Sequence, residues 1–348
     1  MSVMQAWMGA PDGEAVQAEL AANGLTDGLP VVPPTPERIA RMLGDLPAEG
    51  VICDDPLLFN TVTWQDAAIN AVMAGCPVGV LPVLAAAIAA MSAPEFNLLG
   101  VGTTTGSAAP VFIVNGPIAT EFGLNAGPNA LGPGNRANAS IGRAMSFLLR
   151  NVGGATPGEV DMATLGQPAK YTCCFAENEA ESPWTSLAVE RGFAPTDSVV
   201  TVFGASGIVE MVDSVNHDGP GLTQTYAQST LMAGQCGHSD TIGGGEPLII
   251  IPPEVATMLK NDGYDKARTK QAIFDQAIMP VSRLSPKVRA RIEQGWTRAD
   301  PFGPDSVLRL AARAEDILLV VAGGVGIKAA YLPEWSASKA VSRRVARR

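Results

Sequence analysis

The sequence predicts an α/β protein with mixed sheets and an internal duplication, and three observations lead to that class. Short apolar runs are each followed by glycine or proline, which is typical of strands that are buried on both faces. Segments rich in alanine and leucine have the composition of buried helices. Two stretches, residues 109–120 and 246–257, share one order of elements.

Local signals place the individual elements. Strands are predicted at residues 111–114, 199–203, 248–251 and 317–321. Helices are predicted at residues 66–75 and 81–91. A further helix begins at Pro36, where Thr35 is suited to cap it. Residues 204–207 resemble part of a dinucleotide fingerprint, but the third glycine is missing and another apolar run follows, which predicts a hairpin.

The two matching stretches indicate two related halves. APVFIVNGPIAT at 109–120 aligns with EPLIIIPPEVAT at 246–257, each a strand followed by a proline-led helix. Upstream, residues 103–106 match residues 240–243 at the same offset, and downstream each copy passes a turn and enters another helix. Equivalent loops of such halves would meet at a pseudo-symmetric cleft, where α/β proteins often bind ligands.

Domain boundaries follow from this interpretation. We expect a proline-rich N-terminal segment with a helix at 1–60 and a first α/β repeat at 61–170. A second repeat with a C-terminal strand and a basic tail is expected at 171–348. One large domain and two fused halves both suit a chain of 348 residues.

Composition excludes several classes of protein. Hydrophobic residues make up 47% of the chain and charged residues 17%, which excludes disorder and suits a large core or a homo- or hetero-oligomer. The formal net charge of −10 argues against nucleic-acid binding, because phosphate contacts need lysine and arginine. The four arginines of the tail are expected to be solvated.

Cysteine usage and hydropathy predict a cytoplasmic protein without a membrane segment. The five cysteines are an odd number in a long chain, and no basic secretory segment precedes Met8, so reduced thiols are expected. Residues 67–94 carry no charge, yet Pro77 and Pro82 interrupt them. Two buried helices therefore fit this stretch better than a membrane span.

The loop at residues 125–138 is the first candidate site, because it is rich in glycine, proline and asparagine and almost free of charge. Glycine lets a ligand approach the backbone, amides donate and accept, and a helix start attracts anions. We predict that Asn135, Arg136 and Asn138 bind the substrate, with Arg136 as a clamp for a carboxylate or phosphate. The alternative is a structural loop held by its own asparagine side chains.

A second candidate follows residues 171–176, which include two adjacent thiols. Glu177, Glu179 and Glu181 alternate, so like-charge repulsion on one side of a strand would raise at least one pKa toward a general acid–base range. Glu177 is the predicted proton-transfer residue, and Asn178 is predicted to bind the substrate. The alternative is a set of exposed loop acids.

Thiols supply a third candidate. Cys236 and His238 are predicted as a thiolate–imidazole pair, or as metal ligands, which is less favoured because the chain holds only two histidines. Cys76 is a predicted nucleophile if it opens a helix near Pro77, because the helix dipole would then lower its pKa. The alternative for Cys76 is a small buried hydrophobic side chain. The identity of any cofactor stays open.

Two glycine-rich turns add binding candidates. Thr104 lies in the turn before the first matching stretch, and Gly323 and Gly324 follow the strand at 317–321. Backbone N–H groups in such turns are available to a ligand. The alternative is that the glycines only turn the chain.

Four motifs stand out beside these candidates: DGLPVVPPT at 27–35, NAVMAGC at 70–76, GPGNRAN at 132–138 and AENE at 176–179. Together they resemble a bacterial family whose members lie beside, or are fused to, UGSC-motif thiol or selenol proteins. The resemblance spans about residues 27–326 and implies a companion protein in a hetero-oligomeric enzyme. It implies no catalytic residue, and the chain has no Cys-Gly-Ser-Cys motif.

The sequence therefore predicts a small-molecule enzyme, a hydrolase or lyase that acts on a polar, anionic substrate. Arg136 would orient the substrate, Glu177 would transfer a proton, and Cys76 or the Cys236–His238 pair would supply a nucleophile. One alternative is a non-catalytic or co-catalytic subunit in a complex with a thiol or selenol protein. Another is a redox enzyme, against which the missing fingerprint argues. The catalytic hypothesis requires that these polar side chains converge in one pocket.

Overall fold

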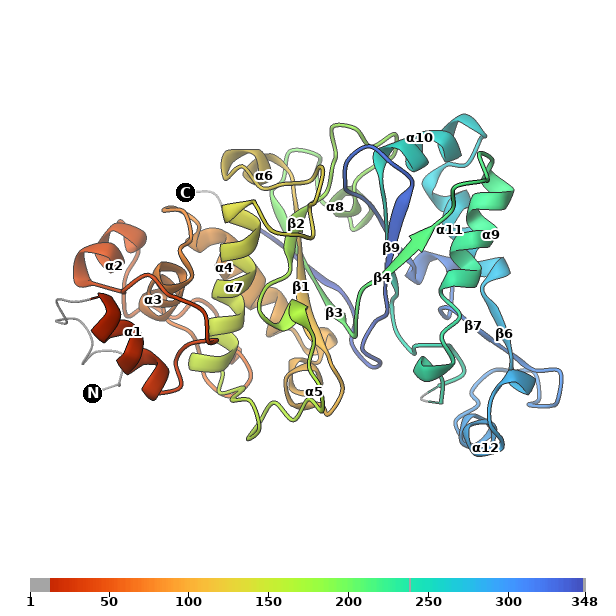
Figure 1. Cartoon of the computed structure of the whole chain (residues 1–348), viewed down its shortest axis with the longest axis horizontal. Helices are drawn as coiled ribbons and strands as arrows, with labels where there is room; N and C mark the ends of the chain where they lie inside the picture. Colours follow the sequence, from red (N-terminus) through yellow and green to blue (C-terminus); the bar gives the residue numbers. More distant parts are fainter. Residues whose placement is uncertain (1–12, 238, 347–348) are drawn as a thin grey trace.

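Two four-stranded sheets pack face to face at the centre of the molecule, and helices cover their outer faces (Figure 1). The computed structural model describes residues 13–237 and 239–346. The α-helices are α1 (Gly13–Ala22), α2 (Pro36–Leu43), α3 (Trp64–Ala74), α4 (Leu81–Met91), α5 (Leu98–Thr103), α6 (Pro117–Glu121), α7 (Arg136–Asn151), α8 (Leu187–Glu190), α9 (Gly219–Ser229), α10 (Pro253–Asn261), α11 (Lys266–Gln276) and α12 (Pro286–Gln294). The strands are β1 (Ala109–Asn115), β2 (Cys174–Ala176), β3 (Val199–Ala205), β4 (Val209–Val212), β5 (Leu248–Ile251), β6 (Ile278–Pro280), β7 (Val307–Arg309), β8 (Leu318–Val321), β9 (Lys328–Leu332) and β10 (Val341–Arg344).

The two large sheets have the same pattern of strand directions. In the first, ordered β10-β3-β1-β2, β1 runs parallel to β2 and antiparallel to β3, and β10 pairs antiparallel with β3. In the second, ordered β4-β9-β5-β8, β5 runs parallel to β8 and antiparallel to β9, and β4 pairs antiparallel with β9. β1 and β5 therefore occupy equivalent positions. β6 and β7 form a separate two-stranded sheet.

The sheets exchange their edge strands. β4 follows β3 along the chain but pairs with β9, whereas β10 follows β9 but pairs with β3. The hairpin predicted after residue 203 is therefore wrong, because the turn there carries the chain from one sheet to the other. A local turn signal predicts a strand on each side but does not determine the partner of either strand.

Alternate side chains of the central strands enter different apolar layers. Ile113 of β1 and Ile250 of β5 face the layer between the sheets. Their neighbours Phe112 and Ile249 face outwards: Phe112 packs with residues of α3, α4 and α7, and Ile249 packs with residues of α9, α10 and α11. Burial on both faces explains why the strands are continuous apolar runs rather than alternating ones.

The predicted α/β class with mixed sheets is confirmed. The matching stretches 109–120 and 246–257 include the equivalent strands β1 and β5, while the duplication itself stays a prediction. The boundary expected after residue 170 does not separate the sheets, because β2, β3 and β10 follow it and complete the first sheet.

The predicted N-terminal helices are present. α3 begins with a reciprocal capping box between Thr63 and Asp66, whereas Thr35 takes the N-cap position of α2 without a side-chain capping bond. α4 begins at residue 81, and the charge-free stretch thus forms two buried helices as expected. Across the residues that the structure describes, no helix has the length and apolarity needed to span a membrane.

Candidate functional site

The loop at residues 125–138 is held by its own asparagine side chains. Asn135 caps α7, because its Oδ1 accepts from the Asn138 backbone N–H at 2.9 Å. The buried Asn138 amide accepts from the Asn125 N–H at 2.8 Å and donates to the carbonyls of Asn125 and Ala130 at 3.0 and 3.1 Å. Both amide hydrogens of Asn138 are thus engaged within the loop, which favours the structural alternative.

Arg136, the predicted anion clamp, is exposed at the first residue of α7. Its Nε donates to the Gly75 carbonyl at 2.8 Å. A hollow of about 540 Å³ is lined by Asn135 and its loop neighbours, but neither Arg136 nor Glu177 belongs to its lining. The predicted convergence of Asn135, Arg136 and Glu177 is not found there.

Glu177 directly follows β2, and its side chain has 0% exposed surface. Its Oε2 accepts from Nδ2 of Asn115 at 2.7 Å and from the Leu187 N–H at 2.8 Å. Its Oε1 has no hydrogen-bond partner and lies 3.9 Å from Nζ of Lys266. Burial raises the pKa of Glu177, and repulsion by Glu179, the expected cause, contributes only weakly.

Lys266 connects Glu177 to a buried charge network between β2, α8 and α11. Its Nζ pairs with Glu190 at 2.6 Å, and Lys270 pairs with the same carboxylate at 3.0 Å. Buried charges need such partners, because an unpaired one is strongly disfavoured in an apolar interior. The geometry is that of a structural joint between β2 of the first sheet and α11, which packs on the second sheet, and a catalytic role of Glu177 stays a prediction.

Three other candidates meet where β2 and β8 end. The Asn178 N–H donates to the last carbonyl of β8 at 2.7 Å, and the Gly323 N–H donates to the Ala126 carbonyl at 2.8 Å. Gly324 packs so closely on Pro128 that a Cβ would lie 2.5 Å from its ring. Loops of the two sheets therefore meet at the carboxyl ends of the parallel strands. Gly323 also lines a neighbouring hollow of about 410 Å³.

The candidate thiols are buried. Cys76 Sγ donates to the Ser140 carbonyl at 3.2 Å, and burial raises the pKa of Cys76 to about 12. Cys236 Sγ lies 3.6 Å from Sδ of Met279, and burial raises the pKa of Cys236 to about 11. The lowering expected for Cys76 is not found, because α4 begins only at residue 81, and the buried alternative is favoured. His238 lies outside the described residues.

The sequence also left metal binding open and singled out Thr104 as a binding residue. In the part of the chain that the structure describes, no three His, Cys, Asp or Glu side chains are grouped to hold a metal ion. The Thr104 hydroxyl accepts from Nε1 of Trp335 at 3.2 Å and from the Gly106 N–H at 3.0 Å. Thr104 thus joins a contact between distant segments of the fold.

A hollow of about 630 Å³ lies elsewhere, between α7, residues 155–171 and the start of β1. We call it the α7 pocket. It is lined by none of the residues that the sequence singled out as a site. Its apolar walls include Val101, Phe112, Met145, Phe147, Leu149 and Leu165.

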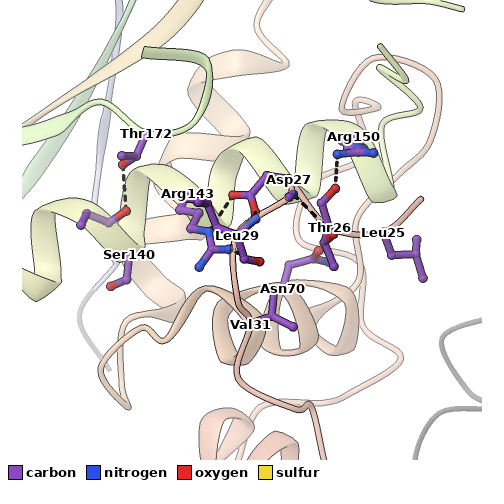
Figure 2. Close-up of polar contacts among 12 residues, drawn as sticks. Leu25, Thr26, Asp27, Leu29, Val31, Asn70, Ser140, Arg143, Arg150 and Thr172 are labelled. Atoms are coloured by element: carbon purple, nitrogen blue, oxygen red, sulfur yellow. Dashed lines mark hydrogen bonds and ion pairs between the residues drawn. The ribbon is translucent and has the colours of Figure 1, made fainter. Parts of the chain in front are cut away.

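Residues 25–31 lie against α7 and contact it through polar groups, as Figure 2 shows. Arg143 donates to the Asp27 carboxylate from Nε at 2.7 Å and from a terminal nitrogen at 2.8 Å. Arg150, the last residue but one of α7, donates from a terminal guanidinium nitrogen to the Thr26 carbonyl. Seven residues are about two helical turns, so both arginines stand on one face of α7. Asp27 thus lies at one edge of the α7 pocket.

Counted together with Arg143, the cations at the α7 pocket exceed the anions by one. Its lining includes Asp27, Arg150, Asp161 and Lys170. Asp161 pairs with Lys170 at 2.6 Å, and Asp27 pairs with Arg143. Arg150 is in none of the ion pairs of the described residues, and its Nε is buried without a hydrogen-bond partner. One positive charge therefore stays uncompensated beside apolar walls.

Sequence reasoning missed this pocket because its parts come from three distant segments, Asp27, residues 101–112 and residues 145–171. The available signals were Asp27, which belongs to a quoted motif, and the seven-residue spacing of Arg143 and Arg150 in a predicted helix. Nothing in the spacing of Asp27 and Arg143 indicates that they pair. The pocket depends on tertiary contacts that the sequence pattern does not encode in a readable form.

Comparison of the chain with protein-family models, with curated proteins and with solved structures finds no match. The resemblance to the family that accompanies UGSC-motif proteins therefore stays a prediction. A fold class hosts many activities, so the function of this chain depends on its site.

Proposed function

We propose that this chain is a small-molecule enzyme that binds an organic anion with an apolar body in the α7 pocket. The observation that carries the proposal is Arg150, a cation without an ion-pair partner in the described residues, which lines an apolar hollow. The substrate class expected from the sequence is kept. We propose Arg150 as the residue that binds the anionic group, in place of Arg136, which is exposed and lies outside this hollow.

Electrostatics and apolar burial act together in such a pocket. A guanidinium binds a carboxylate through charge-assisted hydrogen bonds, and apolar walls weaken the screening by water. Burial of the ligand's apolar body contributes about 25 cal/mol per Å². A volume of about 630 Å³ suits a small organic molecule, since ligand pockets commonly measure about 300–1,000 Å³.

A hydrolase or lyase also needs a group that transfers a proton. Asp161 and Lys170 face each other at 2.6 Å in the lining of the pocket, and their side chains are 17% and 23% exposed. A partly exposed pair is within reach of a ligand, unlike the Glu177 side chain with no exposed surface. We therefore propose Asp161 and Lys170, in place of Glu177, for proton transfer.

A ligand panel tests the binding step. Carboxylates such as hexanoate and 3-phenylpropionate are compared with their primary amides, which have the same shape without the charge. Thermal stabilisation by the carboxylates alone is expected in the wild type and is expected to be lost in Arg150→Gln. The control Arg136→Gln should keep it. Stabilisation that survives Arg150→Gln would overturn the proposal.

A second panel tests the chemistry. Esters, amides and hydroxy acids with the apolar group of the best carboxylate are incubated with the wild type and with Asp161→Asn. The variant is expected to keep carboxylate binding and to lose turnover. Retained turnover in Asp161→Asn would remove Asp161 from the reaction while leaving the binding site intact.

Assembly and location belong to the same proposal. Exposed apolar side chains lie in the pocket lining or next to it: Leu165 and Tyr171 of the lining are 92% and 50% exposed, and the neighbouring Met162 is 49% exposed. A second copy of this chain or a thiol or selenol companion protein would cover such a surface. We also propose that the protein is located in the cytoplasm, because its cysteine usage is typical of a reducing compartment. Light scattering of the purified chain, alone and with that companion, measures the assembly.

A further inference from the structure

Glu334 and Trp335 hold the two glycine-rich segments that precede β1 and β5. The backbone of this pair is fixed at the end of β3, because the Ser206 Oγ donates to the Glu334 carbonyl at 2.9 Å and the Trp335 N–H donates to the Gly204 carbonyl at 2.8 Å. The Trp335 side chain packs on the first segment, where a Cβ on Gly100 would lie 2.3 Å from its ring. The Glu334 side chain enters the second.

The loop at residues 239–246 encloses the Glu334 carboxyl group. The Gly245 N–H donates to Oε1 at 3.0 Å. A Cβ on Gly243 would lie 2.2 Å from Oε1, and a Cβ on Gly245 would lie 2.7 Å from Cγ. Glycine at both positions is therefore required for the loop backbone to close over this side chain.

The enclosed carboxyl group has little to stabilise a negative charge. Glu334 is 1% exposed, its Oε2 has no hydrogen-bond partner, and it is in none of the ion pairs of the described residues. Among the described residues, the ionisable groups that interact with it are Glu246, whose charge repels it, and Tyr331, whose buried hydroxyl has no hydrogen-bond partner. The charge of Cys236 also contributes to raising the pKa of Tyr331.

The remaining acid of the loop is turned to another partner. Asp240 accepts from the Thr297 hydroxyl at 2.6 Å. Burial, with a contribution from Glu246, raises the pKa of Glu334 to about 7. The pKa of Tyr331 is raised as well, so its hydroxyl stays protonated over the physiological range.

We infer that Glu334 is a proton-controlled latch. The loop at residues 239–246 closes over its carboxyl group when that group is neutral, and the loop opens when the group ionises. The neutral group keeps the Gly245 bond and fits the cradle without a buried charge. The ionised group leaves an anionic oxygen without a donor, and opening of the loop lets water solvate it.

Linkage fixes the pH range of the latch. Solvation in the open loop returns the pKa of Glu334 toward its ordinary value of 4.5, whereas in the closed loop it is about 7. Because ionisation is easier in the open state, closure is strongest below about pH 4.5 and weakens as the pH rises to about 7. Above that pH both states are ionised, and the equilibrium no longer changes.

Hydrogen exchange of the whole chain, read by mass spectrometry on the peptide that covers residues 239–246, tests the inference. Rates are measured at about pH 5, 6, 7 and 8 and corrected for intrinsic exchange. One linked proton changes the opening constant by up to about tenfold per pH unit, so we expect that rise between pH 5 and 7 and a plateau above. Glu334→Gln, which cannot ionise, is expected to give a flat profile.

Matched variants separate Glu334 from the other ionisable groups of this region. Glu246→Gln, Asp240→Asn and His238→Gln each remove one ionisable group within residues 238–246 of the sequence, and all three are expected to keep the slope. A flat wild-type profile, or a slope that disappears in any of these three, overturns the inference. These readings decide the matter even if Glu334→Gln does not fold.

Discussion

Arg143 of α7 grips both carboxylate oxygens of Asp27, which lies 116 residues earlier in the chain, at 2.7 and 2.8 Å. The same guanidinium donates to the Leu29 carbonyl at 3.2 Å and lies 4.9 Å from the centre of the Phe147 ring. The two side chains of the ion pair are only 15% and 13% exposed. This contact fixes residues 25–31 on α7 (Figure 2), and with them Asp27 at the edge of the pocket.

Asp27→Ala is expected to lower the free energy of unfolding by about 2–3 kcal/mol, because it leaves a mostly buried guanidinium without its carboxylate. Urea unfolding followed by circular dichroism measures the loss. Arg313→Ala is the control, since the Arg313 side chain, paired with Asp316, is 70% exposed. That change should cost less than about 0.5 kcal/mol, and equal losses in both variants would contradict the assignment.

For the buried charge network at β2, we predict that loss of the cation destabilises the protein more than neutralisation of the carboxylate does. Lys266→Met removes the partner of Glu190 and Glu177 and should destabilise the protein by about 3 kcal/mol. Glu177→Gln keeps an oxygen for Asn115 and Leu187 and should cost less than about 1 kcal/mol. Unfolding experiments measure both. A folded Glu177→Gln variant that loses turnover would restore Glu177 as a catalytic residue.

Thiol reactivity follows from burial. Cys53 is the one partly exposed thiol among the five, and the other four are buried. Because burial raises the pKa of Cys76 and Cys173 to about 12, their thiolates are scarce at pH 8. An Ellman titration should therefore find one fast thiol in the native protein and five after unfolding. Rapid modification of Cys76 or Cys236, located by mass spectrometry, would refute this.

The cradle around Glu334 predicts a strong effect of one added methyl group. Gly243→Ala places a Cβ 2.2 Å from Oε1 of Glu334 and should destabilise the protein by about 1–3 kcal/mol. Gly207→Ala has no heavy atom within 4 Å of its Cβ and should stay within about 0.5 kcal/mol of the wild type. Thermal unfolding compares them. Glu334→Ala in the Gly243→Ala background should relieve the clash, and an unrelieved loss would place its cause elsewhere.

The local sequence pattern was sufficient to predict most strands and helices at the centre of the fold. The strand predicted at 248–251 has those bounds in the structure, and the helix predicted at 81–91 does too, because apolar composition between glycine and proline is a local property. The partner of β4 was not predictable, since strand pairing depends on the path of the chain between distant elements.

The candidate site was harder to predict, because side-chain chemistry was visible but burial was not. Glu177 and Asn138 have the functional groups that a site needs, yet the fold encloses both and uses them in hydrogen bonds of its own. Arg150 looked like an ordinary helix-ending residue. Its value as an anchor depends on its having no ion pair among the described residues, and the sequence contains no signal for that.

The Nε–H resonance of Arg150 gives the most direct test of the α7 pocket. The chain is labelled with ¹⁵N-arginine, the resonance is assigned with Arg150→Lys, and 3-phenylpropionate is titrated in. A saturable shift of the Arg150 resonance, with the Arg136 resonance unmoved, is the predicted result. A resonance of Arg150 that stays in place while the carboxylate binds elsewhere would contradict the account.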